Sequence, residues 1–278
     1  MAPPSTARSI PVDAIDSTFT SKYTNLISAP LGSKILAFSD EWFAAASNLI
    51  TPTPPIRKPG VFTHAGAWYD GWETRRHNTD QRHGWELGSV TEKAYTHVRL
   101  LMYPDGGIAR FRLYGIAVPV FPASADAVFE LSATVMGGVA TSCSDQHFGT
   151  KDNLLLPGRG KDMGDGWETK RTRGEHVDWT IVKLGAKGEI DHLVIDTAHF
   201  RGNFPQKVQV FAGSFEAEPG HEDAAWVEVL EPQKSGPDKE QEYKAELKEV
   251  QGKAYTHAKL VIIPDGGVKR FRVFGKKA

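Results

Sequence analysis

Histidine and aspartate side chains of the kind that transfer protons or bind metals occur together in two short stretches of this sequence. His176 and Asp178 begin one strand-like apolar run, and Asp196 and His199 lie within another. The four residues could act as general acids and bases or ligate a divalent metal, although they lack the close spacing of a motif such as HExxH. Burying carboxylates among apolar residues costs free energy, and proteins keep such residues mainly where they have a function. We therefore interpret the set as a polar site. The structural alternative is that the two aspartates close β-turns.

A seven-residue phrase rich in charged residues is written twice. "DGWETRR" begins at Asp70 and "DGWETKR" at Asp165. A longer pair, "KAYTHVRLLMYPDGGIARFRLYG" and "KAYTHAKLVIIPDGGVKRFRVFG", begins at Lys93 and Lys253. The short phrases are 95 positions apart and the long ones 160, so the first copy is 65 residues shorter between these landmarks. The chain is therefore a tandem duplication in which the first copy lacks its middle.

The overall composition is that of a globular protein with little net charge. Of the 278 residues, 40% are hydrophobic and 24% charged, and the formal net charge is −1, so nothing marks the chain for nucleic acid or an anionic membrane. Cys143 is the single cysteine, which excludes an intrachain disulfide and weakly favours a reducing compartment. No apolar run approaches the roughly 20 residues of a membrane helix, and "MAPPSTARSIPVDAID" lacks a secretory apolar region. We expect a soluble cytoplasmic protein.

The repeats divide the chain into four segments. We predict a loose leader over residues 1–24, a first repeat over 25–115 that is shortened between 77 and 92, a linker over 116–130 and a complete second repeat over 131–278. The second repeat alone contains the strand-like runs "DWTIVKLG", "HLVIDTAHF" and "KVQVFAG". Many short strands, Gly and Pro turns and little helical periodicity predict an all-β fold of two tandem β-sandwiches, the first incomplete.

Each long phrase predicts a β-hairpin. Apolar and polar residues alternate on both sides of a Pro-Asp-Gly-Gly sequence, which supplies the turn. The arginines after the turns alternate along the strand and are most simply a solvated face; they are Arg110, Arg112, Arg270 and Arg272. A first repeat without its middle strands would have unpaired edges and an uncovered core. We expect either contacts from the neighbouring repeat or a shortened chain, as a gene model that omits coding sequence would give.

These motifs resemble one enzyme family. "DGWETRR" after the opening "SDEWFAAASNLI", together with "HVDWTIVKLG", "IDTAHFRGN" and "PDGGIARFRLYG", is similar to allantoicase, whose chains also consist of two related repeats. The resemblance extends from about Asn25 to Gly275 and departs from the family where the first repeat lacks its own middle segments. It implies jelly-roll β-sandwiches of the galactose-binding-like type and hydrolysis of allantoate to ureidoglycolate and urea, a step of purine degradation.

The resemblance implies chemical roles for the charged residues. Allantoate carries a carboxylate, which the forked donors of arginine suit, and two ureido groups on one carbon. Expulsion of urea needs a general acid, and addition of water needs a base or a metal. We expect catalysis by Glu168, His176, Asp178, Asp196 and His199, and substrate binding by Trp167, Arg171, Arg173, Asn203 and, from the first repeat, Glu73, Arg75 and Arg76. Core packing of Trp167 and a surface ion pair between Glu168 and Arg171 are the structural alternatives.

Two other functions stay open on the sequence. A galactose-binding-like sandwich could be a non-catalytic module for sugars or other small ligands, since a fold alone does not decide function. The chain could also be a shortened paralogue with impaired catalysis. For the hydrolase we expect allantoate as the small-molecule partner, with a homo-oligomer as an option and without nucleic acid or membrane. We expect no cofactor, with a divalent metal as the alternative.

Overall fold

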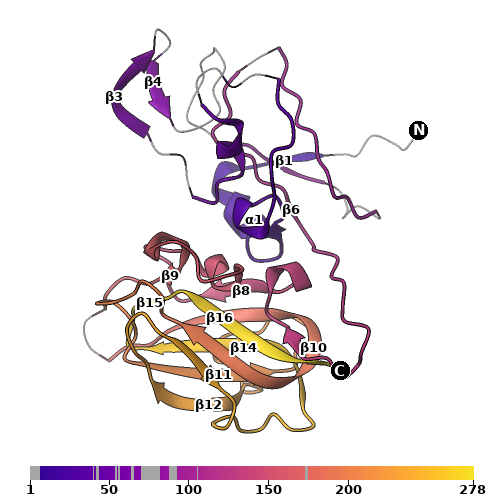
Figure 1. Ribbon diagram of the computed structural model, residues 1–278, viewed down its shortest axis with the longest axis vertical. Coiled ribbons are helices and arrows are strands. Elements are labelled where there is room, and N and C mark those ends of the chain that lie inside the picture. The colour runs from indigo at the N-terminus through magenta and orange to yellow at the C-terminus, as the bar shows by residue number, and fades with distance from the viewer. Residues whose placement is uncertain are drawn as a thin grey trace. The chain divides into compact units, whose positions relative to one another are not determined.

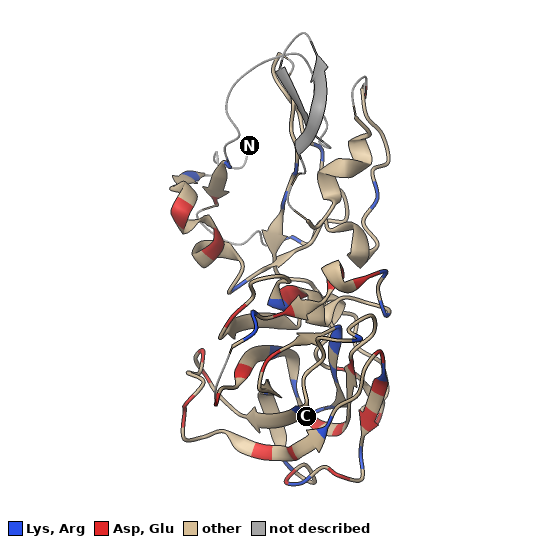
Figure 2. Cartoon of the chain, turned by 90° about the vertical axis from the view of Figure 1, so that its left-hand side faces the viewer, with Lys and Arg blue, Asp and Glu red and all other residues tan. Residues whose placement is uncertain are grey.

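The computed structural model describes residues 7–39, 41, 44–53, 55, 57–63, 66–69, 82–87, 93–104, 106–172 and 175–278. The chain forms two compact units, Met1–Ile116 and Ala117–Ala278 (Figure 1). Most of its regular elements are strands, which confirms the all-β prediction. None of the helices in the described ranges is long and apolar enough to cross a bilayer. Basic and acidic residues are interspersed along the chain of the second unit (Figure 2).

Eight strands of the second unit form one hydrogen-bonded sheet. They are β7 (Phe129–Glu130), β8 (Val139–Cys143), β10 (Asp178–Asp196), β11 (Lys207–Gly213), β12 (Val227–Lys234), β13 (Glu240–Tyr243), β14 (Ala254–Ile263) and β16 (Arg270–Lys277). Their order is β12-β11-β14-β10-β16-β7, with β8 and β13 also paired to β10. A separate small sheet joins β9 (Trp167–Glu168) to β15 (Gly267–Val268). Three short 3-10 helices complete the unit: η4 (Thr134–Met136), η5 (Lys151–Leu155) and η6 (Met163–Asp165).

The long strand β10 bends from one layer of a sandwich into the other. Its residues 178–183 pair with β14 and β8, whereas residues 193–196 pair with β16 and β13, and the register shifts in between. Glycine is required at this corner, because a Cβ on Gly185 would overlap the carbonyl oxygen of Met136. Buried apolar residues from both layers form one core. Two of the predicted strands are thus a single strand that belongs to both layers.

A buried histidine makes the stability of this sandwich depend on pH. His257 of β14 is 3% exposed, and its Nε2 atom has no hydrogen-bond partner among the described residues. Burial, reinforced by the charge of Lys183, lowers the pKa of His257 from 6.5 to about 4. In the pH range between these two values, His257 is therefore protonated in the unfolded chain and neutral in the folded chain.

We expect the second unit to keep this part of its stability above pH 6.5 and to lose it as the pH falls toward 4. The loss should amount to about 3 kcal/mol between the two limits, since one pKa unit corresponds to about 1.4 kcal/mol. Urea denaturation of the His257→Gln variant across this range should show a much weaker pH dependence. The His83→Gln variant, altered at an exposed position of the first unit, serves as the control. Equal pH slopes in wild type and His257→Gln would contradict the prediction.

The described strands of the first unit are short and occur in isolated pairs. They are β1 (Arg8–Ile10), β2 (Thr24–Asn25), β3 (Arg57–Thr63), β4 (Gly66–Tyr69), β5 (Gly84–Glu86) and β6 (Tyr114–Gly115). The pairs are β1–β5, β2–β6 and β3–β4. The helical segments are η1 (Val12–Ala14), α1 (Ile15–Phe19), η2 (Ala29–Leu31) and η3 (Ala46–Ile50). The structure therefore gives this unit no continuous sheet within its described residues.

The β-hairpin predicted from the first long phrase is wrong. The described residues of 93–113 contain no strand, whereas the second long phrase forms β14, β15 and β16. In the second unit β14 pairs with β10 and β11, which come from the segment that the first repeat lacks. Apolar side chains show the consequence: Tyr95 is 67% exposed and Leu101 53%, while their counterparts Tyr255 and Val261 are 5% and 7% exposed. The first repeat has the hairpin sequence without the neighbouring strands that would stabilise it.

Other local contacts are repeated in both units. The openings of the two repeats are 105 positions apart and the closing phrases 160. With these offsets, the Leu26 N–H donates to the Leu113 carbonyl at 2.8 Å, just as the Leu131 N–H donates to the Val273 carbonyl at 2.7 Å. The first unit therefore keeps the contact between the start and the end of its repeat despite the missing middle.

The interpretation of the alternating arginines as a solvated face is wrong for the second unit. Arg270 is 1% exposed, and its guanidinium donates to the carbonyls of Asn153, Gly158 and Asp165. Arg272 forms an ion pair with Glu130 at 2.9 Å. Arg272 also donates to the carbonyls of Leu156 and Gly158. The two guanidinium groups thus provide hydrogen bonds to backbone carbonyls between residues 153 and 165, a described segment that contains no strand. In the first unit, Arg110 and Arg112 likewise donate to carbonyls around Thr53.

Candidate active site

Strand pairing brings the predicted catalytic residues of the second repeat to one end of the sandwich. Asp178, at the start of β10, pairs with Ile262, which lies just before the Pro-Asp-Gly-Gly turn. Asp196, at the end of β10, pairs with Arg270, just after the turn. Between them, β15 pairs with β9, which carries Glu168. Both ends of β10 and the repeated phrase therefore lie beside the same turn.

His176 and Asp178 form a hydrogen-bonded pair at this end. His176 Nε2 lies 3.0 Å from Asp178 Oδ1, and the side chains are 32% and 2% exposed respectively. The Ser144 hydroxyl donates to the same carboxylate oxygen at 2.7 Å. Asp178 Oδ2 is buried and has no hydrogen-bond partner among the described residues. A buried carboxylate that holds one imidazole nitrogen leaves the other nitrogen able to take up or release a proton.

The repeated phrase places a second pair of predicted residues together. Glu168 Oε1 accepts a hydrogen bond from Asn203 Nδ2 at 2.5 Å. Trp167 points the opposite way, because successive residues of a strand face opposite sides. Its side chain is completely buried, and its indole N–H donates to the Asp145 carbonyl at 2.8 Å. The structure therefore places Trp167 in the core rather than at a substrate surface, whereas Glu168 stays partly exposed.

Backbone hydrogen bonds join the segments that occur in both repeats. Thr169, which follows Glu168 in the phrase, exchanges hydrogen bonds with Gly266 of the turn: the Thr169 N–H donates to the Gly266 carbonyl at 3.1 Å, and the Gly266 N–H donates to the Thr169 hydroxyl at 3.1 Å. The Lys170 N–H donates to the Asp145 carboxylate at 2.8 Å. The Ser-Asp opening, the DGWET phrase and the Pro-Asp-Gly-Gly turn are therefore the parts that build this end of the sandwich.

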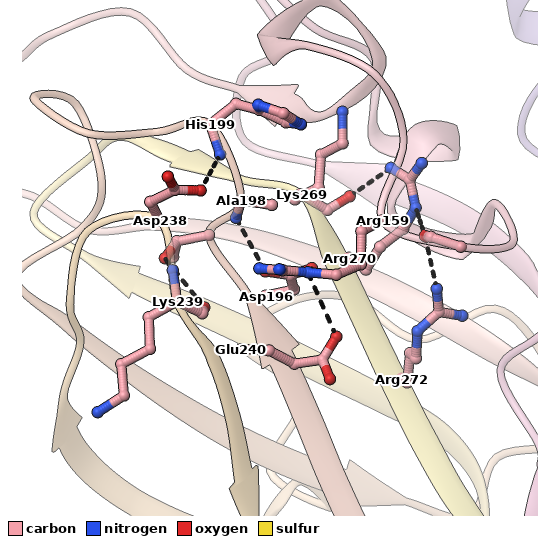
Figure 3. Close-up of polar contacts among 12 residues, drawn as sticks. Arg159, Asp196, Ala198, His199, Asp238, Lys239, Glu240, Lys269, Arg270 and Arg272 are labelled. Carbon is pink, nitrogen blue, oxygen red and sulfur yellow. Dashed lines mark hydrogen bonds and ion pairs between the residues drawn. The ribbon is translucent and has the colours of Figure 1, made fainter.

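Both carboxylate oxygens of Asp196 are engaged by hydrogen bonds within the second unit. Arg159 donates to both of its carboxylate oxygens at 2.8 Å, and the Ala198 N–H donates to one of them at 2.9 Å (Figure 3). The Asp196 side chain is completely buried while that of Arg159 is 51% exposed. In this structure the carboxylate holds the loop that carries Arg159, and the catalytic role expected for Asp196 stays a prediction.

His199 follows Asp196 by three residues, and its backbone rather than its ring is held by a neighbouring side chain. Its backbone has φ +69°, in the left-handed region, and its N–H donates to the Asp238 carboxylate at 2.8 Å (Figure 3). No hydrogen bond of its imidazole to another described residue is present. A left-handed backbone at a residue other than glycine requires support from its surroundings, which Asp238 supplies here. The ring itself is half-buried.

Arg171 is exposed and forms no hydrogen bond or ion pair with the described residues. The surface ion pair between Glu168 and Arg171 is thus absent, and no described residue engages the Arg171 donors. Arg173, Glu73, Arg75 and Arg76 lie outside the described residues. Among the described residues, no group of three or more His, Cys, Asp or Glu side chains is arranged to hold a metal ion.

Sequence reasoning missed two side chains that hold this end together, Ser144 and Arg159. Ser144 belongs to the Ser-Asp dipeptide at the opening of both repeats, and that repetition was a usable signal. Arg159 lies in the glycine-rich stretch "GRGKDMGDG", which gives no sign of the bond to Asp196. The partners are 34 and 37 residues away along the chain, beyond the reach of local patterns.

Comparison with known proteins agrees with these motifs. The allantoicase repeat family model matches residues 24–87, 78–118 and 129–278. The second repeat is thus matched in one piece, whereas the first is matched in two pieces that meet at residues 78–87. This junction lies where the repeats predict the missing middle. The family model matches both halves of the chain and covers most of its length.

Individual relatives place the missing segment on the same scale. Allantoicase of Neurospora crassa is 50% identical over 344 residues, covering 98% of this chain and 96% of that protein. Since 98% of 278 residues is about 272, about 72 of the 344 aligned positions have no counterpart here. Allantoicase of Saccharomyces cerevisiae is 42% identical over 326 residues, covering 91% of this chain and 94% of that protein.

Solved structures give the same result for the fold. The crystal structure of the Saccharomyces cerevisiae allantoicase matches with a TM-score of 0.74 and 36% identity, covering 97% of this chain and 99% of the other. A second allantoicase structure matches with a TM-score of 0.79 and 37% identity, covering 96% and 99%. With family model, relatives and structures in agreement over nearly the whole chain, this protein belongs to the allantoicase family.

Proposed function

We propose that this chain hydrolyses allantoate to ureidoglycolate and urea, with the chemistry carried out in the second unit. The observation that carries the proposal is the His176–Asp178 pair, in which a buried carboxylate holds a half-exposed imidazole beside the motifs that define the family. The first repeat has no counterpart of this pair, because its sequence lacks the corresponding segment. A non-catalytic binding module would have no need of such a pair.

The reaction exchanges one ureido group of allantoate for a hydroxyl group. The bond between the central carbon and a ureido nitrogen breaks, and a bond from that carbon to a water oxygen forms. With His176 Nε2 directed at Asp178, the other ring nitrogen, Nδ1, can accept a proton from the attacking water. The imidazolium then returns that proton to the nitrogen of the departing urea, so the histidine ends as it began. Asp178 stabilises the imidazolium without itself taking the proton.

Asn203 and Arg171 are proposed substrate contacts, and we propose that Glu168, predicted from the sequence as a catalytic residue, also contacts the substrate. A ureido group presents several N–H donors and one carbonyl acceptor, which a carboxylate and a side-chain amide complement. The Glu168–Asn203 pair offers both functions within one hydrogen-bonded unit. Arg171, whose forked donors are not engaged by a described residue, suits the substrate carboxylate. Arg173, Glu73, Arg75 and Arg76 lie outside the described residues, and their role in substrate binding stays a prediction. His199 is retained as a second candidate for proton transfer.

We further propose that the reaction takes place in the cytoplasm, with allantoate as the small-molecule partner and without a resident cofactor. The reaction is a hydrolysis, and an imidazole is sufficient in principle to activate water. A divalent metal is the alternative, and treatment of the purified chain with EDTA separates the two: an unchanged rate supports the metal-free reaction, and a rate restored by Zn²⁺ or Mn²⁺ contradicts it. The oligomeric state follows from the mass of the purified protein in solution.

The deciding experiment measures urea and ureidoglycolate released from allantoate by the purified chain. We expect turnover by the wild type, and a KM at least tenfold higher in Glu168→Gln, because the variant loses a charged acceptor for the ureido N–H groups. Glu216→Gln, which alters an exposed loop residue, is the matched control and should behave like the wild type. Binding of allantoate by calorimetry without any turnover would instead support a non-catalytic module.

A further inference from the structure

We propose that Ser144 is a positioning residue for the proton-transferring pair, acting through Asp178. The inference rests on the proposed function, since it concerns the same site. The Ser144 hydroxyl and His176 Nε2 both approach Asp178 Oδ1, at 2.7 Å and 3.0 Å. Ser144 itself is exposed, and its hydroxyl contacts the carboxylate of Asp178, whose side chain is 2% exposed.

Asp178 depends on few donors. Among the described residues, its side chain has two polar partners, and both contact Oδ1, while Oδ2 is buried without one. A buried carboxylate needs hydrogen bonds to remain ionised, because burial favours its neutral form. The serine hydroxyl is therefore one of only two described contacts that favour the charged carboxylate, and the charged carboxylate is the form that orients the imidazole.

The direction of the Ser144 hydroxyl proton is set by the backbone. The Trp179 N–H donates to Ser144 Oγ at 2.9 Å, and the Ser144 N–H donates to the Trp179 carbonyl at 2.9 Å. With one lone pair of Oγ already engaged, the hydroxyl can donate to the carboxylate at 2.7 Å or to the Trp179 carbonyl at 3.4 Å. The shorter bond to an anion is the stronger. These contacts extend the ladder between β8 and β10 by one residue and lock the serine in place.

Two titratable groups, Cys143 and Asp145, flank Ser144, and Glu175 precedes His176 in the described part of the chain. Cys143 precedes Ser144 at the end of β8, and burial raises the pKa of its thiol to about 11, so it is neutral at physiological pH. The same thiol interacts electrostatically with Lys151, Asp152, Asp145 and Asp178. On the neighbouring strand β14, the residue paired with Asp178 is the uncharged Ile262. Asp145 is held by the Lys170 and His147 backbone N–H groups.

The test compares Ser144→Ala with three other serine variants over a range of pH. Ser142→Ala is the matched control, because Ser142 lies two residues away on β8 and its hydroxyl has no hydrogen bond to a described residue. Ser144→Thr keeps the donor and should behave like the wild type. Ser144→Cys keeps a weak donor and remains informative if Ser144→Ala fails to fold. The measurements are kcat/KM for allantoate against pH and the NMR titration of the His176 ring.

We expect the acid limb of the kcat/KM profile to move up by about one pH unit in Ser144→Ala, with KM unchanged at high pH. Without the serine donor the carboxylate is less stabilised, so the His–Asp pair takes up a proton more readily and the basic form persists only at higher pH. The NMR midpoint of the His176 ring should move in the same direction, and Ser144→Cys should show an intermediate shift.

Failure of the positioning role can be distinguished from failure of the proposed function. If the wild type turns over allantoate and the profiles of Ser144→Ala and Ser142→Ala coincide, the positioning role is wrong. If the wild type shows no turnover, the proposed function is wrong, but the His176 titration still decides on Ser144: an unchanged midpoint in Ser144→Ala overturns the inference. Equal loss of activity at every pH would indicate a merely structural serine and would also overturn it.

Discussion

Replacing His176 with alanine is expected to lower kcat for allantoate hydrolysis by about 10²–10⁴-fold, the usual contribution of a general acid–base group. Asp178→Asn should lower kcat by a similar factor, because the amide can present its NH₂ group to the imidazole and favour the wrong tautomer. The measurement is steady-state release of urea at saturating allantoate. KM should change little, since neither residue is proposed to bind the ground state of the substrate.

A matched control is available on the same strand. His192 also contacts an aspartate, Asp191, at 2.7 Å, but it pairs with Phe274 away from the turn. His192→Ala should therefore leave kcat within about twofold of the wild type, because the half-buried His192 ring contacts Asp191 and Phe274 and none of the proposed site residues. The double variant His176→Ala/Asp178→Asn should be no slower than His176→Ala, because residues that act as a unit are not additive. Wild-type kcat in His176→Ala would remove the pair from the mechanism.

Restoring the missing middle of the first repeat is expected to stabilise the first unit strongly. The change inserts, between residues 77 and 92, the corresponding segment of the Neurospora crassa relative, which supplies most of the roughly 72 positions absent here. New strands would pair with the segment that contains Tyr95, Val98, Leu101 and Tyr103, which are 67%, 50%, 53% and 83% exposed. Burying four such side chains should add roughly 5 kcal/mol to the free energy of unfolding.

Urea denaturation measures this effect, with separate transitions expected for the two units because each has its own core. The transition of the first unit should move to higher urea while that of the second stays in place. Inserting the same segment in the linker around residue 120 is the control, and it should leave both midpoints unchanged. An unchanged urea midpoint of the first unit after insertion at 77–92 would contradict the prediction, because it would show that the missing segment does not stabilise this unit.

Local sequence patterns determined most of the second unit. The alternation of apolar residues identified the strands that became β10, β11 and β14, and the Pro-Asp-Gly-Gly turn correctly separated β14 from β16. The duplicated phrases also indicated the family and the region in which the first repeat is shortened. The strands and the turn follow from periodicity and turn chemistry within about ten residues, so they can be predicted without knowledge of distant contacts.

The same local pattern failed where the partner strands are absent. The first long phrase has the alternation of a hairpin, but its described residues before Tyr114 form no strand, because the first repeat lacks equivalents of β10 and β11, the strands with which β14 pairs on its two edges. A strand pattern records which face of a segment is apolar. Whether the strand forms depends on neighbours that can be anywhere in the chain.

The sequence by itself determined the duplication, the all-β class, the family and the group of residues from which the site is built. Only the tertiary structure showed their contacts: Asp196 is held by Arg159 from 37 residues away, Asp178 is held by Ser144 from 34 residues away, and Trp167 is turned into the core. The reason is physical. The residue type sets what a carboxylate can do, but its charge, burial and partners are set by groups that only folding brings within hydrogen-bond distance.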